Sequence, residues 1–481
     1  MMRSMFSGVS GLRAHQTRMD VIGNNIANVN TVAFKSSRVT FQEIFNQTIR
    51  GASAPDPVTG RGGSNPMQVG LGISVGSVDT ITTRGSVQRT DNPTDLSIEG
   101  DGFFIVRGGD NDTYRFTRAG NFGIDKNGNL VTASGMNVYG WQAYETDLSG
   151  NIVYDTERSI EKINLYEDAF SGNKRLIDAR ATTQVGLAGN LNAVQTFPTT
   201  AGTPATPSEP TYSSTSKFTV PITVYDSLGN DYRLQIDFVR NNVDNSGTIA
   251  GQSYPLTMWY YRVLPAKSSE ADVESISCSN STAFATGEGV ADGYIAFDAN
   301  GNLVPESVDA SMANFVNVQS ITITPQTTEI GAGSFDVNID FTKISMYKAD
   351  GSIRPTIDGY PTGSLVTFSI GSDGIITGVY SNGQQSPLGM LALANFENAA
   401  GLQKVGENMY LPTTNSGEFK KGVKAGTEGI GTISPGTLEM SNVDLSKEFT
   451  EMIITQRGFQ ANSRIITASD EILQELVNLK R

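Results

Sequence analysis

Residues 441–481 read SNVDLSKEFTEMIITQRGFQANSRIITASDEILQELVNLKR, and this stretch indicates how the end of the chain folds. Apolar side chains recur at every seventh position, beginning just upstream of it. That spacing places them on one stripe of a helix, the pattern by which a helix buries one face against another. The predicted stripe comprises Leu438, Leu445, Met452, Phe459, Ile466 and Leu473.

The same stretch carries signals for the two ends of a helix. Ser441, followed by Asn442, can accept hydrogen bonds from free backbone N–H groups at a helix start, and Asp444 would lie in the positively polarised first turn. Lys480 and Arg481 would place cations at the negative end of the helix dipole.

The first thirty residues show a second stripe with the same period. We predict a helix that stops near Asn30, because Asn is a poor interior helix former and tolerates left-handed backbone conformations. The Asn cluster at this end includes Asn24, Asn25 and Asn28. The stripe itself comprises Met5, Leu12, Met19 and Ile26, with Val9, Ile22 and Val29 at the offset positions.

Each stripe alone could belong to a helix inside an ordinary domain. Chain ends usually fray, however, and here they are among the most regularly patterned parts of the sequence. Two such stripes enclose several hundred residues with β character, which favours a role in which the ends act together.

Residues 70–435 predict a β structure. Gly102–Val106 is a short apolar strand bounded by Gly, Leu96–Ile98 alternates, and turn dipeptides recur along the segment. The stretches 199–216 and 266–289 are rich in small and polar residues and predict loops; Cys278 lies in the second. The turn dipeptides are Asn127-Gly128, Asn300-Gly301, Asp350-Gly351, Asp373-Gly374 and Asn382-Gly383, each suited to a hairpin.

Composition narrows the class of protein. The 481 residues predict two or three domains, and 38% hydrophobic residues with 51 Gly and 18 Pro predict several modest cores. The formal charge of −14 argues against nucleic acid as a partner. One cysteine cannot form an internal disulfide, and no apolar run suits a signal peptide or a membrane span, so we expect no membrane partner.

Motifs for chemistry are weak. The segments starting at Asp125 and Asp298 resemble calcium loops, but Gly is fourth in each, and Met136 and Asp309 occupy the position where a bidentate Glu is needed. We interpret both as hairpin turns. His15, the only histidine, cannot assemble a zinc site or a catalytic triad alone, so we predict a packing or surface residue and no catalytic, metal or cofactor site.

Several longer motifs resemble those of the flagellar rod, hook and hook-associated proteins. At the N-terminus these are Ser10-Gly11-Leu12, Asp20–Asn28 and Phe34-Lys35-Ser36. At the other end, Ser441–Arg481 is similar to the hook members in particular, through Val443–Ser446. Internal segments 224–230, 359–363, 380–384 and 393–396 also resemble hook proteins.

The resemblance implies a mainly β fold with α-helical termini, arranged as nested domains. Residues 1–30 and 440–481 would form an inner coiled-coil domain, and 31–70 with 425–439 would be connecting segments. Residues 71–145 and 354–424 would form a β-rich middle domain. Residues 146–353 would form an inserted outer β domain with room for an added subdomain.

The function implied is that of a structural subunit of the flagellar hook, polymerised into a hollow, curved, flexible tube. Such a tube transmits motor torque and conducts exported subunits. The stripe residues would carry polymerisation, through ends disordered until a neighbouring copy supplies the surface they lack. Implied partners are further copies, the distal rod protein, the hook cap protein, the hook–filament junction protein and the flagellar type III export apparatus. The location implied is extracellular, without a cleavable signal peptide.

One departure and two alternatives accompany this interpretation. Some spirochete hooks are crosslinked through a Cys that would align near Gly189, so the crosslink is not carried over to Cys278. The alternatives are a distal rod or hook-associated axial protein, and a secreted β-rich adhesin. Two heptad ends argue against the adhesin, and the long middle insertion argues against the rod protein.

Overall fold

The structure is a computed structural model that describes residues 2–55, 60, 62–108, 113–146, 152–168, 172–194, 217–240, 245–249, 252–266, 273–278, 291–304, 317–325, 333–427 and 429–479. The chain forms two compact units. Unit 1 contains residues 1–175, 367–379 and 385–481, and unit 2 contains 176–366 and 380–384. The mainly β fold with α-helical termini is as the sequence predicts, and the two long helices both belong to unit 1.

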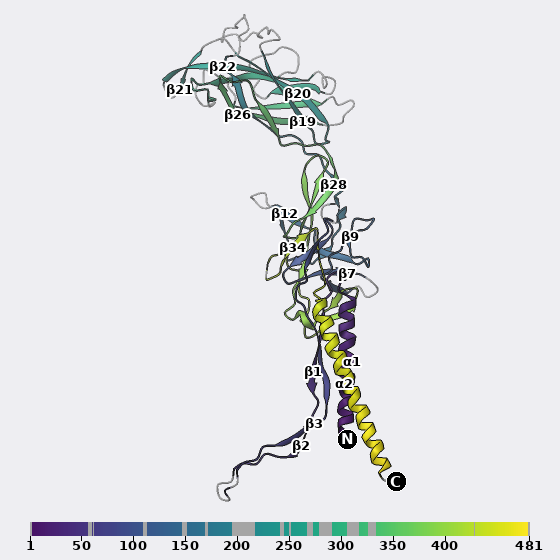
Figure 1. The fold of residues 1–481 in the computed structure, drawn as a ribbon. Helices are drawn as coiled ribbons and strands as arrows, with labels where there is room; N and C mark the ends of the chain where they lie inside the picture. Colours follow the sequence, from purple (N-terminus) through teal and green to yellow (C-terminus); the bar gives the residue numbers. More distant parts are fainter. Residues whose placement is uncertain are drawn as a thin grey trace. The chain divides into compact units, whose positions relative to one another are not determined.

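The helices of unit 1 are α1 (Met2–Ala27) and α2 (Leu445–Asn478). They lie side by side and run in opposite directions, so that the two chain ends lie at the same end of the pair (Figure 1). Beside them runs an antiparallel ribbon, hereafter the ribbon, that also contacts α1 through β1 and β4. In the ribbon, β1 (Ser37–Glu43) pairs with β4 (Ile73–Thr80), and β2 (Asn46–Arg50) pairs with β3 (Met67–Gly70).

The main sheet of unit 1 has the order β29-β30-β11-β7-β8-β33-β32. Its central strand β7 (Phe103–Arg107) is the predicted apolar strand, and its Phe103 packs in an aromatic core with Phe116, Phe396 and Tyr410. The other strands are β8 (Tyr114–Thr117), β11 (Asn137–Trp141), β29 (Ile375–Tyr380), β30 (Gln385–Leu391), β32 (Gln403–Gly406) and β33 (Met409–Leu411).

Shorter strands complete unit 1. They are β5 (Val87–Arg89), β6 (Leu96–Glu99), β9 (Gly123–Ile124), β10 (Leu130–Val131), β12 (Tyr144–Thr146), β13 (Ile152–Tyr154), β14 (Glu161–Lys162), β15 (Glu167–Asp168), β16 (Gly172–Asn173), β31 (Leu393–Ala394), β34 (Thr432–Pro435) and β35 (Thr437–Glu439), with a 3-10 turn at Ala399–Gly401. Strand β6 pairs with β34 and β5 pairs with β35, which brings the start of the β region against the segment that leads into α2.

Unit 2 contains two five-stranded sheets that share one core, which includes Leu187, Trp259 and Phe341. One sheet has the order β23-β25-β26-β18-β27: β23 (Val273–Cys278), β25 (Val318–Pro325), β26 (Phe335–Tyr347), β18 (Gln184–Asn192) and β27 (Arg354–Ile357). The other contains β19 (Phe218–Tyr225), β20 (Asp231–Arg240), β22 (Gln252–Pro265), β21 (Asn245–Ile249) and β24 (Ala291–Phe297). Strand β17 (Leu176–Ile177) also pairs with β28 (Gly363–Ile370).

Two predictions about the β region are wrong. Residues 273–278, predicted as loop, form β23, because Val273 and Ile276 are buried in the core on either side of a register shift and β25 supplies a partner strand. Asp350-Gly351 joins no hairpin, since β26 and β27 lie on opposite sides of β18. Gly is needed at 351 for another reason: a Cβ there would lie 2.6 Å from the ring of Phe218. The predicted loop at 199–216 lies outside the described residues.

The two segments that resemble calcium loops are hairpin turns, as predicted. Asp125 Oδ1 accepts hydrogen bonds from the backbone N–H groups of Asn127 and Asn129, and the turn connects β9 to β10. Asp298 accepts the equivalent pair from Asn300 and Asn302. Each carboxylate is therefore used to close its own turn.

Candidate functional site: the terminal helices and their junction

The contact between α1 and α2 is made largely by small and polar residues, hereafter the polar seam. At one end Asn25 Nδ2 donates to Glu448 Oε1 at 3.2 Å, and Arg18 pairs with Glu451 at 3.1 Å. Further along, His15 lies against Gly458, and Gly11 lies against Asn462. From Asn25 to His15 and from Glu448 to Gly458 the step is ten residues in each helix, so one antiparallel register relates them. The seam residues are Gly8, Gly11, His15, Arg18, Ile22 and Asn25 in α1, and Glu448, Glu451, Thr455, Gly458, Asn462 and Ile465 in α2.

The predicted stripes have the right period and the wrong phase. Seam positions recur with the three-then-four spacing of a heptad, but Leu12, Met19, Met452 and Phe459 are each one residue beyond a seam position. They flank the seam and are half-buried, as are Met5, Ile26 and Leu473. Ile466 is also half-buried, but it reaches the seam, because a Cβ on Gly8 would lie 3.3 Å from its Cγ1. Ile22 alone among the predicted residues is fully buried in the seam.

Leu438 is a further correction. It lies in β35, where it pairs with Gln88 of β5, and the helix starts seven residues later, at Leu445. Leu445 is exposed. Pairing with β5 occupies the backbone of Leu438 and excludes it from the helix, although its spacing fits the stripe.

The Asn residues that end α1 have separate tasks. Asn28 Nδ2 donates to the carbonyl of Asn24 at 2.9 Å, and its Oδ1 accepts from Thr31, so this pair closes the last helical turn. Asn25 points the other way and is 1% exposed. Its amide both donates to the carbonyl of Ser37 and accepts from the N–H of Ser37, which ties α1 to the first residue of β1.

At the start of α2, the predicted cap is misplaced. Asp444, not Ser441, is the N-cap: its Oδ1 accepts from the N–H groups of Ser446 and Lys447. Ser441 accepts from Val443 just before the helix. Asn442 is a clamp, because its Oδ1 accepts from the N–H of Ser36 at 2.7 Å and its Nδ2 donates to the carbonyls of Ile81 and Thr83. Lys480 and Arg481 lie outside the described residues.

A buried ionic cluster that sequence reasoning missed is centred on Glu439 of β35, shortly before α2 begins. Glu439 is 0% exposed, and its two oxygens bind Lys35 at 2.6 Å and Arg118 at 3.4 Å. It also accepts from the N–H of Gly85. Burial lowers the pKa of Lys35, and the Glu439 carboxylate opposes that shift. Lys35 appears in a recognised motif, but nothing in the sequence pairs it with a carboxylate 404 residues away.

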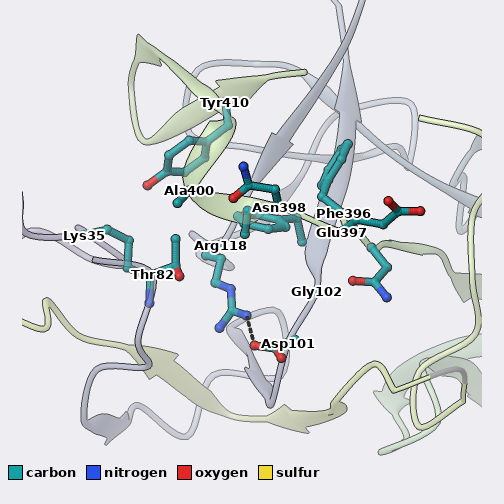
Figure 2. A pocket seen from close by; sticks show the side chains of 13 residues that line it. Lys35, Thr82, Asp101, Gly102, Arg118, Phe396, Glu397, Asn398, Ala400 and Tyr410 are labelled. Atoms are coloured by element: carbon teal, nitrogen blue, oxygen red, sulfur yellow. Dashed lines mark ion pairs between the residues drawn. The ribbon is translucent and has the colours of Figure 1, made fainter. Parts of the chain in front are cut away.

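A pocket opens beside this cluster (Figure 2). It is lined by polar and aromatic groups that include Lys35, Arg118 and Tyr410. Arg118 lies between Lys35 and Phe396, with an ion pair of 3.9 Å to the exposed Asp101. Burial raises the pKa of the Tyr410 phenol to about 12. The Lys35 ammonium and the Arg118 guanidinium already bind Glu439 and the carbonyls of Thr83 and Gly100. They therefore stabilise the contacts between these segments of unit 1.

His15 and possible metal-ligand clusters were the remaining candidates for a chemical site in the described part of the chain. His15 is a packing residue: its ring meets Phe41 of β1 edge-on at 5.6 Å. Within the described ranges, no three His, Cys, Asp or Glu side chains cluster as metal ligands would. Neither α1 nor α2 has an apolar stretch of the kind that a membrane crossing requires.

Large apolar side chains remain exposed on both the helices and the ribbon. On α2 they include Phe449, Ile453 and Ile472, each about half exposed. On and beside the ribbon they include Phe45 and Ile49. Exposed apolar groups in this number mark surfaces for association. Among the side chains that the structure describes in these segments, the exposed large apolar ones are Phe6, Ile44, Phe45, Ile49, Met67, Val69, Val78, Leu445, Phe449, Ile453, Ile454, Ile465, Ile472, Leu476, Val477 and Leu479.

Comparison with known families gives the class of the protein. Four family models match along the chain: flagella basal body rod protein (residues 5–35), flagellar hook protein FlgE/F/G D1 domain (97–171), flagellar basal body protein FlaE D2 domain (190–360), and flagellar basal body rod FlgEFG protein C-terminal (434–479). The chain therefore belongs to the class of flagellar rod and hook proteins.

Similar individual proteins narrow the class. The flagellar hook protein FlgE of Borreliella burgdorferi is 39% identical over the whole of both chains, and that of Escherichia coli is 32% identical over 98% of both. A Bacillus subtilis protein named flagellar basal-body rod protein FlgG is 29% identical over the whole of both. A crystal structure of Helicobacter pylori flagellar hook protein FlgE2 has a TM-score of 0.46 at 15% identity, covering 72% of this chain and 98% of that one. This chain belongs to the flagellar hook protein family and is a structural subunit of the hook.

Proposed function

We propose that the chain polymerises through α1 and α2 into a hollow, curved and flexible tube that transmits torque and conducts exported subunits. The observation that supports this proposal is the division of side chains on α2. Small and polar residues pack against α1, while Phe449, Ile453 and Ile472 stay about half exposed. Because each is already about half buried, burying the rest against a neighbouring copy would contribute roughly 0.8–1.5 kcal/mol each. Head-to-tail repetition of one contact gives an open filament.

The proposed domains follow the nested order of the resemblance. Residues 1–30 and 440–481 would line the tube, 31–70 and 425–439 would connect, 71–145 and 354–424 would surround it, and 146–353 would face solvent. Limited proteolysis of the free subunit tests the disorder of the ends, because it should trim both and leave a core of roughly residues 70–430. Full protection of both ends in the free subunit would contradict it.

The proposed partners beyond further copies are the distal rod protein, the hook cap protein, the hook–filament junction protein and the type III export apparatus. The proposed location is the extracellular hook. The proposed role is not enzymatic, since Lys35 and Arg118 at the pocket are used by Glu439. Copurification of the full chain with each partner tests these contacts one by one.

The polymerisation proposal is tested by truncation and point substitution. A chain ending at Asp444 retains the Asn442 clamp and the Glu439 cluster, so it should fold as a soluble monomer that forms no tubes. Phe449→Ser with Ile453→Ser should raise the concentration needed for assembly about tenfold or more. Leu228→Ser, an exposed residue of unit 2, is the matched control. Tubes formed by the truncated chain would refute the proposal.

The rod alternative rests on the Bacillus subtilis relative named as a rod protein, which is less similar to this chain than the Borreliella burgdorferi and Escherichia coli hook proteins. Electron microscopy of polymers assembled from the full chain separates the two. Short curved tubes support the hook, and straight rigid ones support the rod. The adhesin alternative has no further observation in its favour.

A further inference from the structure

Asn25 occupies a position in the polar seam where an apolar residue would be expected. It is 1% exposed, and its side chain makes three hydrogen bonds. Two join it to the backbone of Ser37, at 2.8 and 3.0 Å, and the third reaches Glu448 Oε1 at 3.2 Å. Only the third bond crosses to α2. A slipped alignment would therefore leave one N–H of the buried Asn25 amide without its acceptor and the buried Glu448 Oε1 without its donor, which is how a polar residue at such a position favours one register.

The small residues of the seam fit only the same alignment. A Cβ on Gly458 would lie 2.8 Å from the His15 ring, and one on Gly11 would lie 2.8 Å from the Asn462 amide. Each bulky side chain therefore faces a glycine of the other helix. A slip of seven residues in one direction would place His15 opposite Ile465, and a slip in the other would place it opposite Glu451.

The charged residues of the seam favour the same alignment of the two helices. Arg18 pairs with Glu451 at 3.1 Å, and its guanidinium lies 5.6 Å from the Phe41 ring centre. Glu448 Oε2 and Thr455 Oγ1 are buried without a hydrogen-bond partner among the described residues. Thr455 therefore adds no polar contact that would fix the alignment in the middle of the seam. The contacts of Asn25 and Arg18 at one end, next to the Asn442 clamp, define the alignment.

We propose that the polar seam sets the register of the terminal helix pair, with Asn25 as the positioning residue and the Arg18–Glu451 pair as its support. The inference rests on the proposal that these helices carry polymerisation. A slip of seven residues would move every exposed apolar side chain of α2 by about 10 Å along α1. Subunits in different registers would then present different surfaces, and one repeated contact could not form.

Disulfide mapping in a Cys278→Ser background reads the register directly. Gly8→Cys with Ile466→Cys reports the observed alignment, because the Cβ of residue 8 would lie 3.3 Å from Ile466 Cγ1. Gly8→Cys with Leu473→Cys reports a slip of seven residues. In assembled polymers of the full chain, only the first pair should give an intrachain disulfide, seen as a faster band on a non-reducing gel.

Asn25→Asp should bring a second carboxylate against Glu448 and remove the donor to Ser37. We expect the slipped disulfide to rise about tenfold or more relative to the first, the ratio that about 1.4 kcal/mol gives at 25 °C. Adding Glu448→Gln should restore the single register, because the repulsion is gone. A single register and normal tubes in Asn25→Asp would overturn the inference.

The charge pair gives an independent variant in case Asn25→Asp misfolds. Arg18→Glu and Glu451→Arg should each admit the slipped disulfide, and the double swap should suppress it again. Arg233→Glu, which breaks an exposed pair with Asp231 in unit 2, is the control and should change nothing. Slipping that the double swap leaves unchanged would overturn the role of this pair. Failure of the polymerisation proposal is separate, since it would appear as tubes from the chain ending at Asp444.

Discussion

Glu439→Gln is the most informative single substitution for the stability of unit 1. Glu439 and its two cationic partners are all at most 4% exposed, so the carboxylate is the only buried negative charge in the cluster. The amide preserves the shape, but it leaves the buried Lys35 without its counter-charge and the buried Arg118 with only the exposed Asp101, at 3.9 Å. It also turns an NH₂ group toward either Lys35 or Arg118, which are themselves donors.

Two independent figures give the magnitude. Unit charges about 4 Å apart interact by about 4 kcal/mol at an effective dielectric constant of about 20. Removal of one partner from a buried pair costs about 3–5 kcal/mol in measured cases. We therefore expect unit 1 to lose about 3–5 kcal/mol of its free energy of unfolding. Asp231→Asn, which breaks an exposed pair in unit 2, should cost less than about 1 kcal/mol.

The two tryptophans make the assay specific to each unit. Trp141 is buried in the core of unit 1, and Trp259 is buried in unit 2. In a Trp259→Phe background, urea unfolding of the full chain followed by fluorescence reports unit 1, and so the effect of Glu439→Gln. A Trp141→Phe background reports unit 2, and so the effect of the control Asp231→Asn. A loss below about 1 kcal/mol for Glu439→Gln would refute the reasoning, because it would mean that the cluster behaves like a surface pair.

The pH dependence offers a second check on the same variant. The folded pKa of Lys35 lies below 10.5 because of burial, and loss of the carboxylate lowers it further. Between the folded pKa and 10.5 the unfolded chain binds more protons, so stability rises with pH in that window. The penalty of Glu439→Gln should therefore shrink as the pH approaches 10.5, and a constant penalty would show that Lys35 is not its source.

Three further predictions concern the helices and the sheet. Burial and Arg18 lower the folded pKa of His15 below 6.5, so the helix pair should lose stability as the pH falls through 6.5. Light scattering should therefore show tubes disassembling between pH 7.5 and 5.5, and His15→Gln should make the extent of disassembly less dependent on pH. Asp444→Ala should cost α2 about 1 kcal/mol in thermal melts followed by circular dichroism, whereas Asp444→Asn should melt like the parent chain. Gly140→Ala should destabilise unit 1 by about 1–3 kcal/mol or more in urea, because its Cβ would collide with the carbonyl of Met390; an unchanged midpoint would contradict the close approach of β11 and β30.

The sequence by itself determined the classes of element and the ends of the chain. Seven-residue spacing predicted both helices, because it reflects the geometry of a helix that buries one face. The Asn cluster predicted the end of α1 within three residues, since local backbone preference governs a helix terminus. Gly102–Val106 and the turns at Asp125 and Asp298 were also readable, because a short apolar run and an Asp-x-x-Gly turn depend on neighbours in sequence.

Only the tertiary structure decided which residues meet. The phase of the helix seam could not be read from hydrophobicity, because Gly458 receives His15 and Asn25 binds both Ser37 and Glu448, while the apolar residues flank the contact. Leu438 fits the stripe but pairs with β5 as part of a strand. Strand β23 forms because β25 supplies its partner. Lys35 and Glu439 are 404 residues apart in the sequence, and the pairing of β5 with β35 is what brings Glu439 to Lys35. Sequence patterns record local geometry, whereas long-range polar contacts are settled by the fold that desolvates them.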